Sequence, residues 1–217
     1  MKKDLTELVF VIDKSGSMGH LVDDTIGGFN SMIEKQKNES GSVNVTTVLF
    51  SSGCYVLHDC IDINEVEALT PKHYVPYGMT ALFDAIGRTI DMVGERLSNT
   101  PEDERPEKVI FVITTDGKEN ASEHYTRSQV KEMIEHQQDK YSWTFMFLGA
   151  NINAEEEAES LGIHKEFSKT YTASNIGVAS TYQVVSDVVS CARSVDTNSY
   201  DSGDWISQAM CFMDDIV

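Results

Sequence analysis

Three short apolar runs constrain the fold of this chain more than any other feature of its sequence. They are residues 8–12 (LVFVI), 108–114 (KVIFVIT) and 143–148 (WTFMFL). A strand that is apolar along nearly its whole length is buried on both faces, as a central strand of a parallel sheet is. Parallel strands need crossover connections, and segments with helical periodicity separate these runs. The sequence therefore predicts an α/β fold with helices on both faces of a mostly parallel sheet.

The remaining elements follow from periodicity and from glycine and proline breaks. Residues 43–50 and 55–59 flank a Ser-Ser-Gly turn and predict a hairpin, so one edge strand should be antiparallel. A last edge strand is expected at 164–167. Helices are expected at 20–37, 81–97, 128–138, 154–161 and 174–193, with a weak short helix at 63–69. Together these elements predict a three-layer sandwich with a central sheet.

The chain has 217 residues, a length that fits one domain of this class. Its character changes after residue 194, where a polar stretch precedes a segment with apolar residues on one helical face. Those apolar residues are Trp205, Ala209, Phe212 and Ile216. We therefore expect a domain at 1–194 and an acidic C-terminal tail at 195–217 with an amphipathic helix. The tail either docks on the domain or binds a partner.

The charge balance narrows the classes of partner. Seventeen Lys and Arg against 35 Asp and Glu give a net charge of −18, which disfavours nucleic acids and anionic membranes. No apolar run approaches the ~18 residues of a membrane span or resembles a signal peptide. The cysteines Cys54, Cys60, Cys191 and Cys211 lack metal-ligand spacing, and reduced thiols are favoured over a single Cys54–Cys60 bridge. A cytoplasmic protein is expected.

One segment after the first apolar run carries candidate metal ligands. Asp13, Ser15 and Ser17 are spaced two residues apart in a glycine-containing strand-to-helix turn. Open α/β sheets place their ligands at the carboxyl ends of the strands, where this turn lies. A carboxylate and two hydroxyls form an all-oxygen set that suits Mg²⁺ or Mn²⁺ better than zinc. The structural alternative is an ordinary helix cap, because Asp and Ser are common at that position.

Two further turns strengthen the metal hypothesis. Thr80 precedes the helix at 81–97, and Asp116 follows the strand at 108–114. Taken alone, Thr80 could be an N-cap and Asp116 a turn residue before Gly117. Neighbouring strand ends would, however, bring Asp13 and Asp116 together, and two close carboxylates need a cation between them. Three turns thus deliver oxygen ligands to one edge of the sheet.

These segments, residues 10–18, 78–85 and 112–117, resemble the von Willebrand factor A family over about residues 5–193. The resemblance implies a Rossmann-like fold and a metal-ion-dependent adhesion site (MIDAS). Asp13, Ser15, Ser17, Thr80 and Asp116 would hold the ion, directly or through water. Mg²⁺ is expected, with Mn²⁺ or Ca²⁺ as alternatives. A partner Asp or Glu would complete the coordination, so the chain is expected to be a stand-alone prokaryotic or phage adaptor, for which an ATPase or a stress-response component is a candidate partner.

Residues around the predicted ligands have secondary expectations. Asp84 recurs near the site in relatives and is expected just outside the ligands. Met18, Met79 and Gly117 are expected at the rim. The second loop departs from the family because Met79 stands where many relatives have glycine, and this side chain could form a hydrophobic lip.

Two other functions remain open at this stage. A Mg²⁺-dependent phosphotransfer or hydrolase enzyme is disfavoured because Ser15 stands where a dehalogenase-type phosphatase has its second acid, and Ser17 is not in a G-x-S-x-G elbow. Alternatively, the metal site is vestigial and the tail at 195–217 binds the partner.

Overall fold

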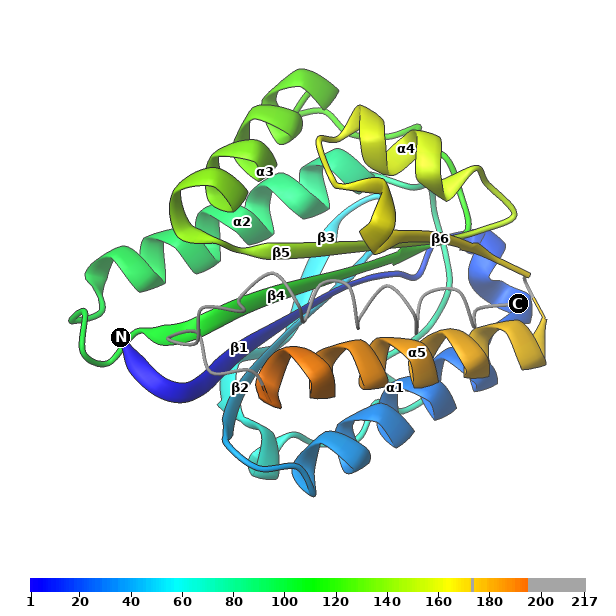
Figure 1. Ribbon diagram of the computed structural model, residues 1–217. Coiled ribbons are helices and arrows are strands. Elements are labelled where there is room, and N and C mark those ends of the chain that lie inside the picture. Colours follow the sequence, from blue (N-terminus) through cyan, green and yellow to red (C-terminus); the bar gives the residue numbers. More distant parts are fainter. Residues whose placement is uncertain (173, 195–217) are drawn as a thin grey trace.

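The strands β1 (Lys2–Asp13) and β4 (Pro106–Thr115) lie side by side in the middle of a six-stranded sheet (Figure 1). The computed structural model describes residues 1–172 and 174–194. The strand order is β3-β2-β1-β4-β5-β6, and every neighbouring pair is parallel except β2 with β3. The other strands are β2 (Ser42–Phe50), β3 (Cys54–Asp62), β5 (Thr144–Ala150) and β6 (Ser168–Tyr171). The predicted mostly parallel sheet with one antiparallel edge strand is confirmed.

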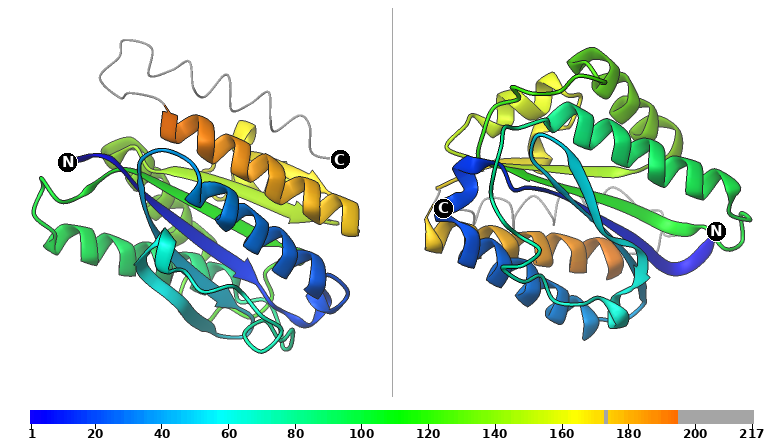
Figure 2. Two further views of the ribbon diagram at one scale, coloured as in Figure 1. Left: turned by 90° about the horizontal axis from the view of Figure 1, so that it is seen from below. Right: turned by 180° about the vertical axis from the view of Figure 1, so that it is seen from behind.

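Helices cover both faces of this sheet (Figures 1 and 2). One face carries α2 (Leu82–Asn99), α3 (Arg127–Tyr141) and α4 (Ala154–Ser160), and the other carries α1 (Val22–Lys37) and α5 (Asn175–Ser194). The described residues also form three short 3₁₀ helices, which are η1 (Gly16–His20), η2 (Ile63–Glu65) and η3 (Lys165–Phe167). None of the helices in the described part of the chain is long and apolar enough to cross a membrane.

The core explains why β1 and β4 occupy the centre. Residues 8–12 of β1 are fully buried, and 109–113 of β4 are nearly so. From one face, Phe29 of α1 packs edge-on against Phe10 with ring centroids 5.1 Å apart. From the other face, α2 contributes buried Ile86 and Ile90. Each such side chain removed from water stabilises the fold by about 1.5–3 kcal/mol, and only a strand with no polar face can bury both sides.

Several element boundaries differ from the sequence prediction. The helix expected from residue 20 begins at Val22, after the separate turn η1. The helix expected at 63–69 is the single turn η2. The edge strand expected at 164–167 is wrong: the Phe167 N–H donates to the His164 carbonyl and closes η3, and the strand follows as β6. The predicted tail lies outside the described residues.

The two cysteines considered for a disulfide do not form one. Cys54 and Cys60 stand at the start and near the end of β3, so the strand itself separates them. Cys60 instead donates from its thiol to Glu7 at 3.6 Å. Burial raises the pKa of the Cys60 thiol to about 11, and the neighbouring Glu7 carboxylate adds to this effect.

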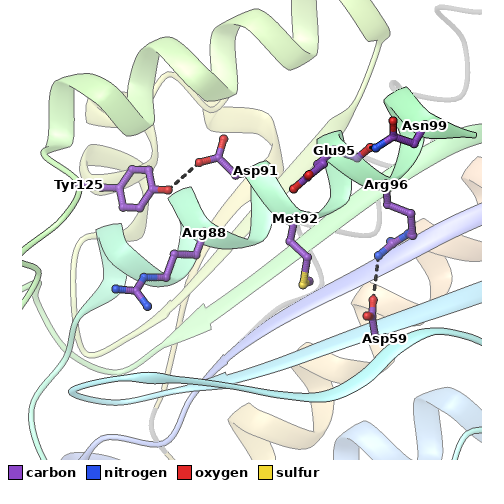
Figure 3. Close-up of a pocket in the computed structure, with 8 residues that line it drawn as sticks. All are labelled: Asp59, Arg88, Asp91, Met92, Glu95, Arg96, Asn99 and Tyr125. Carbon is purple, nitrogen blue, oxygen red and sulfur yellow. Dashed lines mark hydrogen bonds and ion pairs between the residues drawn. The ribbon is translucent and has the colours of Figure 1, made fainter.

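A buried ion pair attaches α2 to the sheet. Glu7 on β1 is fully buried, and its Oε1 accepts hydrogen bonds from Arg96 at 2.6 Å and from Thr46 at 2.9 Å. Arg96 also reaches Asp59 on β3 at 2.8 Å, as Figure 3 shows. Burial raises the pKa of Glu7, whereas the Arg96 guanidinium and the Thr46 hydroxyl oppose the rise. The pair therefore compensates a carboxylate that would otherwise be isolated in the core.

We predict that Arg96→Met lowers the free energy of unfolding by about 3–5 kcal/mol, because it leaves the buried Glu7 carboxylate without its cation. The double variant Glu7→Leu with Arg96→Met should recover most of this loss. Urea unfolding measures both. Asp59→Asn is the control, since it removes only an exposed partner and should cost no more than about 1 kcal/mol. If Arg96→Met loses no more stability than Asp59→Asn, Arg96 is not the cation that compensates the buried Glu7 carboxylate.

Candidate metal centre

The candidate site lies where β1 and β4 end at the same edge of the sheet. Ile12 pairs with Thr114, so Asp13, the last residue of β1, lies next to Thr115. Asp116 follows β4 directly. The parallel register places both carboxylates at the carboxyl ends of adjacent central strands, which is where α/β sheets bind ligands.

Asp13 is fully buried and is held by three neighbours. Its Oδ1 accepts from the Ser15 backbone N–H at 2.6 Å, and its Oδ2 accepts from the Thr115 hydroxyl at 2.6 Å. The Tyr74 hydroxyl donates to the Asp13 carbonyl at 2.5 Å. Burial raises the pKa of the Asp13 carboxyl, the Thr115 and Ser15 hydrogen bonds oppose this, and the nearby Asp116 charge adds to it. A nearby cation would favour the ionised form.

The two serines connect the first loop to the third. Ser15 is buried, and its hydroxyl lies 3.1 Å from that of Ser17. Ser17 is exposed and donates to Asp116 Oδ1 at 2.6 Å. Asp116 itself is only 8% exposed. The oxygens of Ser15, Ser17 and Asp116 therefore form a continuous chain across the end of the sheet.

Thr80 brings the second loop to the same place. Its side chain is buried, and a Cβ added at Gly117 would lie 3.3 Å from the Thr80 hydroxyl and 3.8 Å from the Ser17 hydroxyl. Both hydroxyls thus lie against the same glycine of the third loop. The structure therefore gathers all five predicted ligand residues at one edge of the sheet, although their role as ligands stays a prediction.

Hydrogen bonds that the sequence did not indicate join the three loops to one another. Asn120 Oδ1 accepts from the Thr80 N–H at 2.8 Å, and the Asn120 N–H donates to the Thr80 carbonyl at 3.0 Å. The Gly16 N–H donates to the Gly78 carbonyl at 3.0 Å. Of the residues that support the site, Thr115 alone had a usable signal, since it directly precedes Asp116 at a strand end. Tyr74 and Asn120 reach the site from loops with no periodicity.

Asp84 binds backbone groups of the loop that follows Asp116. Its carboxylate accepts from the backbone N–H groups of Glu123, His124 and Tyr125 at 3.2, 2.9 and 2.8 Å. Burial raises the pKa of Asp84, but these three hydrogen bonds outweigh it and leave the pKa below its ordinary value. Asp84 therefore anchors the loop that follows Asp116 to the start of α2.

The three predicted rim residues differ in position. Met18 is 1% exposed and belongs to the hydrophobic core, so its prediction as a rim residue is wrong. The turn η1 points this side chain inward, which the sequence pattern alone did not indicate. Met79 is 56% exposed, and Gly117 is partly exposed beside Thr80 and Ser17. These two positions are accessible at the surface of the site.

The donor set fits a divalent cation. Asp13 and Asp116 form no ion pair with a basic side chain in the described ranges, so two adjacent carboxylates lack a compensating charge. Oxygen donors of this kind suit Mg²⁺, Mn²⁺ or Ca²⁺. The described residues contain no cluster of three or more His, Cys, Asp and Glu that could hold a metal, so hydroxyls have to supply the rest of the donor set here.

A separate surface hollow of about 580 Å³ lies between α2 and β3 (Figure 3). Two pairs of its polar side chains bind each other: Tyr125 donates to Asp91 at 2.6 Å, and Arg96 binds Asp59. The strand-end site differs, because among the described residues Asp13 and Asp116 form no ion pair with a basic side chain.

Comparison with known proteins agrees with this architecture. The von Willebrand factor type A domain profile matches residues 7–184. No curated protein sequence matches the chain. The vWF domain of the type V pili tip protein Mfa5 from Porphyromonas gingivalis superposes with a TM-score of 0.63 and 10% identity, covering 89% of this chain and 98% of that one.

Two longer proteins contain a similar unit. Proximal thread matrix protein 1 from the mussel byssus, solved with zinc in its MIDAS motif, gives a TM-score of 0.60 at 16% identity. The match covers 88% of this chain and 47% of the mussel protein, so the chain spans less than half of that relative's length. The pilus adhesin SpaC from Lactobacillus rhamnosus GG gives 0.66 at 14% identity, over 88% of this chain and 31% of that one. At these identities the likeness shows the fold alone.

We predict that millimolar Mg²⁺ raises the melting temperature of the EDTA-treated protein and that Asp116→Asn abolishes the rise. Binding to the native state alone stabilises it by about 2.7 kcal/mol at a hundredfold excess over Kd. Thermal unfolding measures the effect. Asp139→Asn, on the exposed surface of α3, is the control because it removes the same charge far from the site. If Mg²⁺ raises the melting temperature of Asp116→Asn as much as that of Asp139→Asn, Asp116 is not a metal ligand.

We also predict that Thr115→Val weakens metal binding about 10–100-fold, because the variant loses the hydroxyl that orients Asp13. Calorimetric titration with Mn²⁺ gives the affinity. Thr115→Ser keeps the hydroxyl and should bind within a few-fold of wild type. Wild-type affinity in Thr115→Val would show that this hydrogen bond does not position a ligand.

Proposed function

The chain belongs to the von Willebrand factor type A domain family, and we propose that it is a protein-binding module that captures an Asp or Glu carboxylate of its partner through a bound divalent cation. The observation that carries this proposal is the pair of buried carboxylates, Asp13 and Asp116, at adjacent strand ends. Within residues 1–172 and 174–194 neither forms an ion pair with a basic side chain. Once bound there, a cation supplies a coordination position for an oxygen from outside the chain. Binding and not catalysis is the role that such a site supports.

The side chains at the site would have different roles in binding the ion. Asp13 and Asp116 would neutralise the ion, and the hydroxyls of Ser15, Ser17 and Thr80 would complete the donor set on the protein side. Thr115 holds the Asp13 carboxylate and Asn120 holds the Thr80 backbone, so the donors are oriented before any ligand arrives. Such pre-organisation lowers the entropic cost of binding.

We propose Mg²⁺ as the resident ion, with Mn²⁺ or Ca²⁺ as alternatives, because every donor is an oxygen. The mussel relative was solved with zinc in its MIDAS motif, so zinc belongs in any metal titration of this chain. Comparing how much each of these four metals stabilises the protein identifies the ion that the site prefers.

A catalytic role has less support at this site. His20 is the histidine nearest in sequence to the first loop, and its Nδ1 lies 2.8 Å from the Ser17 backbone carbonyl. This contact leaves Nε2 as the ring nitrogen that could act as a base, but in the described part of the chain no hydrogen bond joins His20 to the Ser17 hydroxyl, as a serine nucleophile would need. The Ser17 hydroxyl donates instead to Asp116.

The proposal also covers the class of partner and the cellular compartment. The net charge of −18 argues against nucleic acid and anionic membrane as partners. We propose an adaptor in the cytoplasm whose partner presents an Asp or Glu, with ATPase or stress-response components as candidates. Cys54 and Cys60, which are not disulfide-bonded to each other, are compatible with that compartment. Similar structures from pilus proteins come from a different setting, so compartment does not follow from the fold.

We predict that immobilised glycine-rich peptides with a single Asp or Glu bind the Mg²⁺-loaded protein, and that the matching Asn and Gln peptides do not. Surface plasmon resonance measures the binding. EDTA and Asp116→Asn should each abolish it, because both remove the cation. Equal binding to Asp and Asn peptides, or binding that survives EDTA, would refute the proposed function.

A further inference from the structure

Exposed apolar side chains gather beside the candidate metal centre. Tyr55 lies near the start of β3, and Tyr77 and Met79 lie in the loop before α2. Tyr55, Tyr77 and Met79 are 52%, 58% and 56% exposed. Single exposed apolar residues need no explanation, but a group of them beside a binding site does. We call Lys14, Tyr55, Tyr77 and Met79 the aromatic platform.

Hydrogen bonds and a lysine hold this platform together. The Met79 N–H donates to the Ser52 hydroxyl at 2.9 Å, which ties the loop to the turn between β2 and β3. Lys14 Nζ lies 5.0 Å from the Tyr77 ring centroid and 6.0 Å from that of Tyr55. One ammonium thus contacts two tyrosine rings. These cation–π contacts order the exposed rings before a partner arrives.

The platform shares its backbone with the metal-site loops. Lys14 stands between Asp13 and Ser15, and Met79 directly precedes Thr80. The Tyr77 N–H donates to the Lys14 carbonyl at 3.0 Å. A short partner segment that reaches the metal centre with one side chain therefore passes the platform with its neighbours.

Charge complementarity indicates what kind of segment fits. The chain carries a net charge of −18, so an acidic partner is repelled by most of its surface. At this edge, a divalent cation would offset the two carboxylates, and Lys14 would add a positive charge. An acidic segment is therefore steered to this edge, where the side chain next to its carboxylate meets tyrosine and methionine.

We propose that the partner segment carries an aromatic or large aliphatic residue within two positions of its metal-binding Asp or Glu, and that this residue packs on the aromatic platform. The inference rests on the proposed function and specifies the partner of the same site. Apolar contacts of this kind supply binding energy that a single carboxylate cannot, since buried aromatic residues dominate many protein interfaces.

Peptides test the proposal directly. Each contains one Asp in a glycine-rich background, with Phe one or two positions before or after it, and a matched peptide has Ser in place of Phe. Binding to the Mg²⁺-loaded full chain is measured by surface plasmon resonance. At least one Phe peptide should bind about tenfold more tightly than its Ser match, the scale of one well-packed aromatic contact. The double variant Tyr55→Ser with Tyr77→Ser should lose that gain.

Tyr141→Ser is the matched control, because Tyr141 is 52% exposed and its ring also lies under a lysine, Lys140, at 5.2 Å, but at the C-terminal end of α3 away from the metal loops. It should keep the gain. The proposal is overturned if no Phe peptide exceeds its Ser match, or if the gain survives loss of both platform tyrosines. Metal-induced stabilisation of the double variant should equal that of wild type. Loss of the Asp-over-Asn preference would instead refute the proposed function itself.

Discussion

Two carboxylates at the ends of adjacent central strands are the constraint on which the rest of this structure depends. Asp13 and Asp116 are nearly or fully buried, lie within one cluster of hydroxyls and have no basic partner in the described ranges. Like charges held this way oppose folding unless a proton or a cation compensates them. The contrast with Glu7 is informative, because that buried carboxylate has Arg96. A cation is the compensation that this oxygen-rich edge suits.

The surrounding structure can be understood as support for those two charges. The parallel register of β1 and β4 places them side by side. The Thr115 hydroxyl binds the Asp13 carboxylate, and the Tyr74 hydroxyl binds the Asp13 backbone carbonyl. Asp84 and Asn120 attach the third loop to the second, so that the Thr80 hydroxyl faces the same glycine as Ser17. The exposed tyrosines beside Lys14 then add two aromatic rings and an ammonium group to this edge.

The sequence predicted the fold and the gathering of the five candidate ligands because both follow from local signals: apolar runs define central strands, and polar turns follow them. It failed where a side chain's direction depends on tertiary packing. Met18 adjoins the metal loop in sequence, yet η1 turns it into the core. The last edge strand is β6 and not 164–167, because Lys165–Phe167 form the 3₁₀ turn η3. Tyr74 and Asn120 come from aperiodic loops, so nothing in their sequence context indicated a contact with the site.

The most direct test of the account is a crystal of the protein grown with Mn²⁺ and measured at a wavelength where manganese scatters anomalously. The account predicts one strong anomalous peak among the side chains of Asp13, Ser15, Ser17, Thr80 and Asp116. Some of their oxygens should lie within coordination distance of it, about 2.0–2.3 Å, and the others should reach it through bound water. A peak elsewhere on the acidic surface, with none at the ends of β1 and β4, would contradict it.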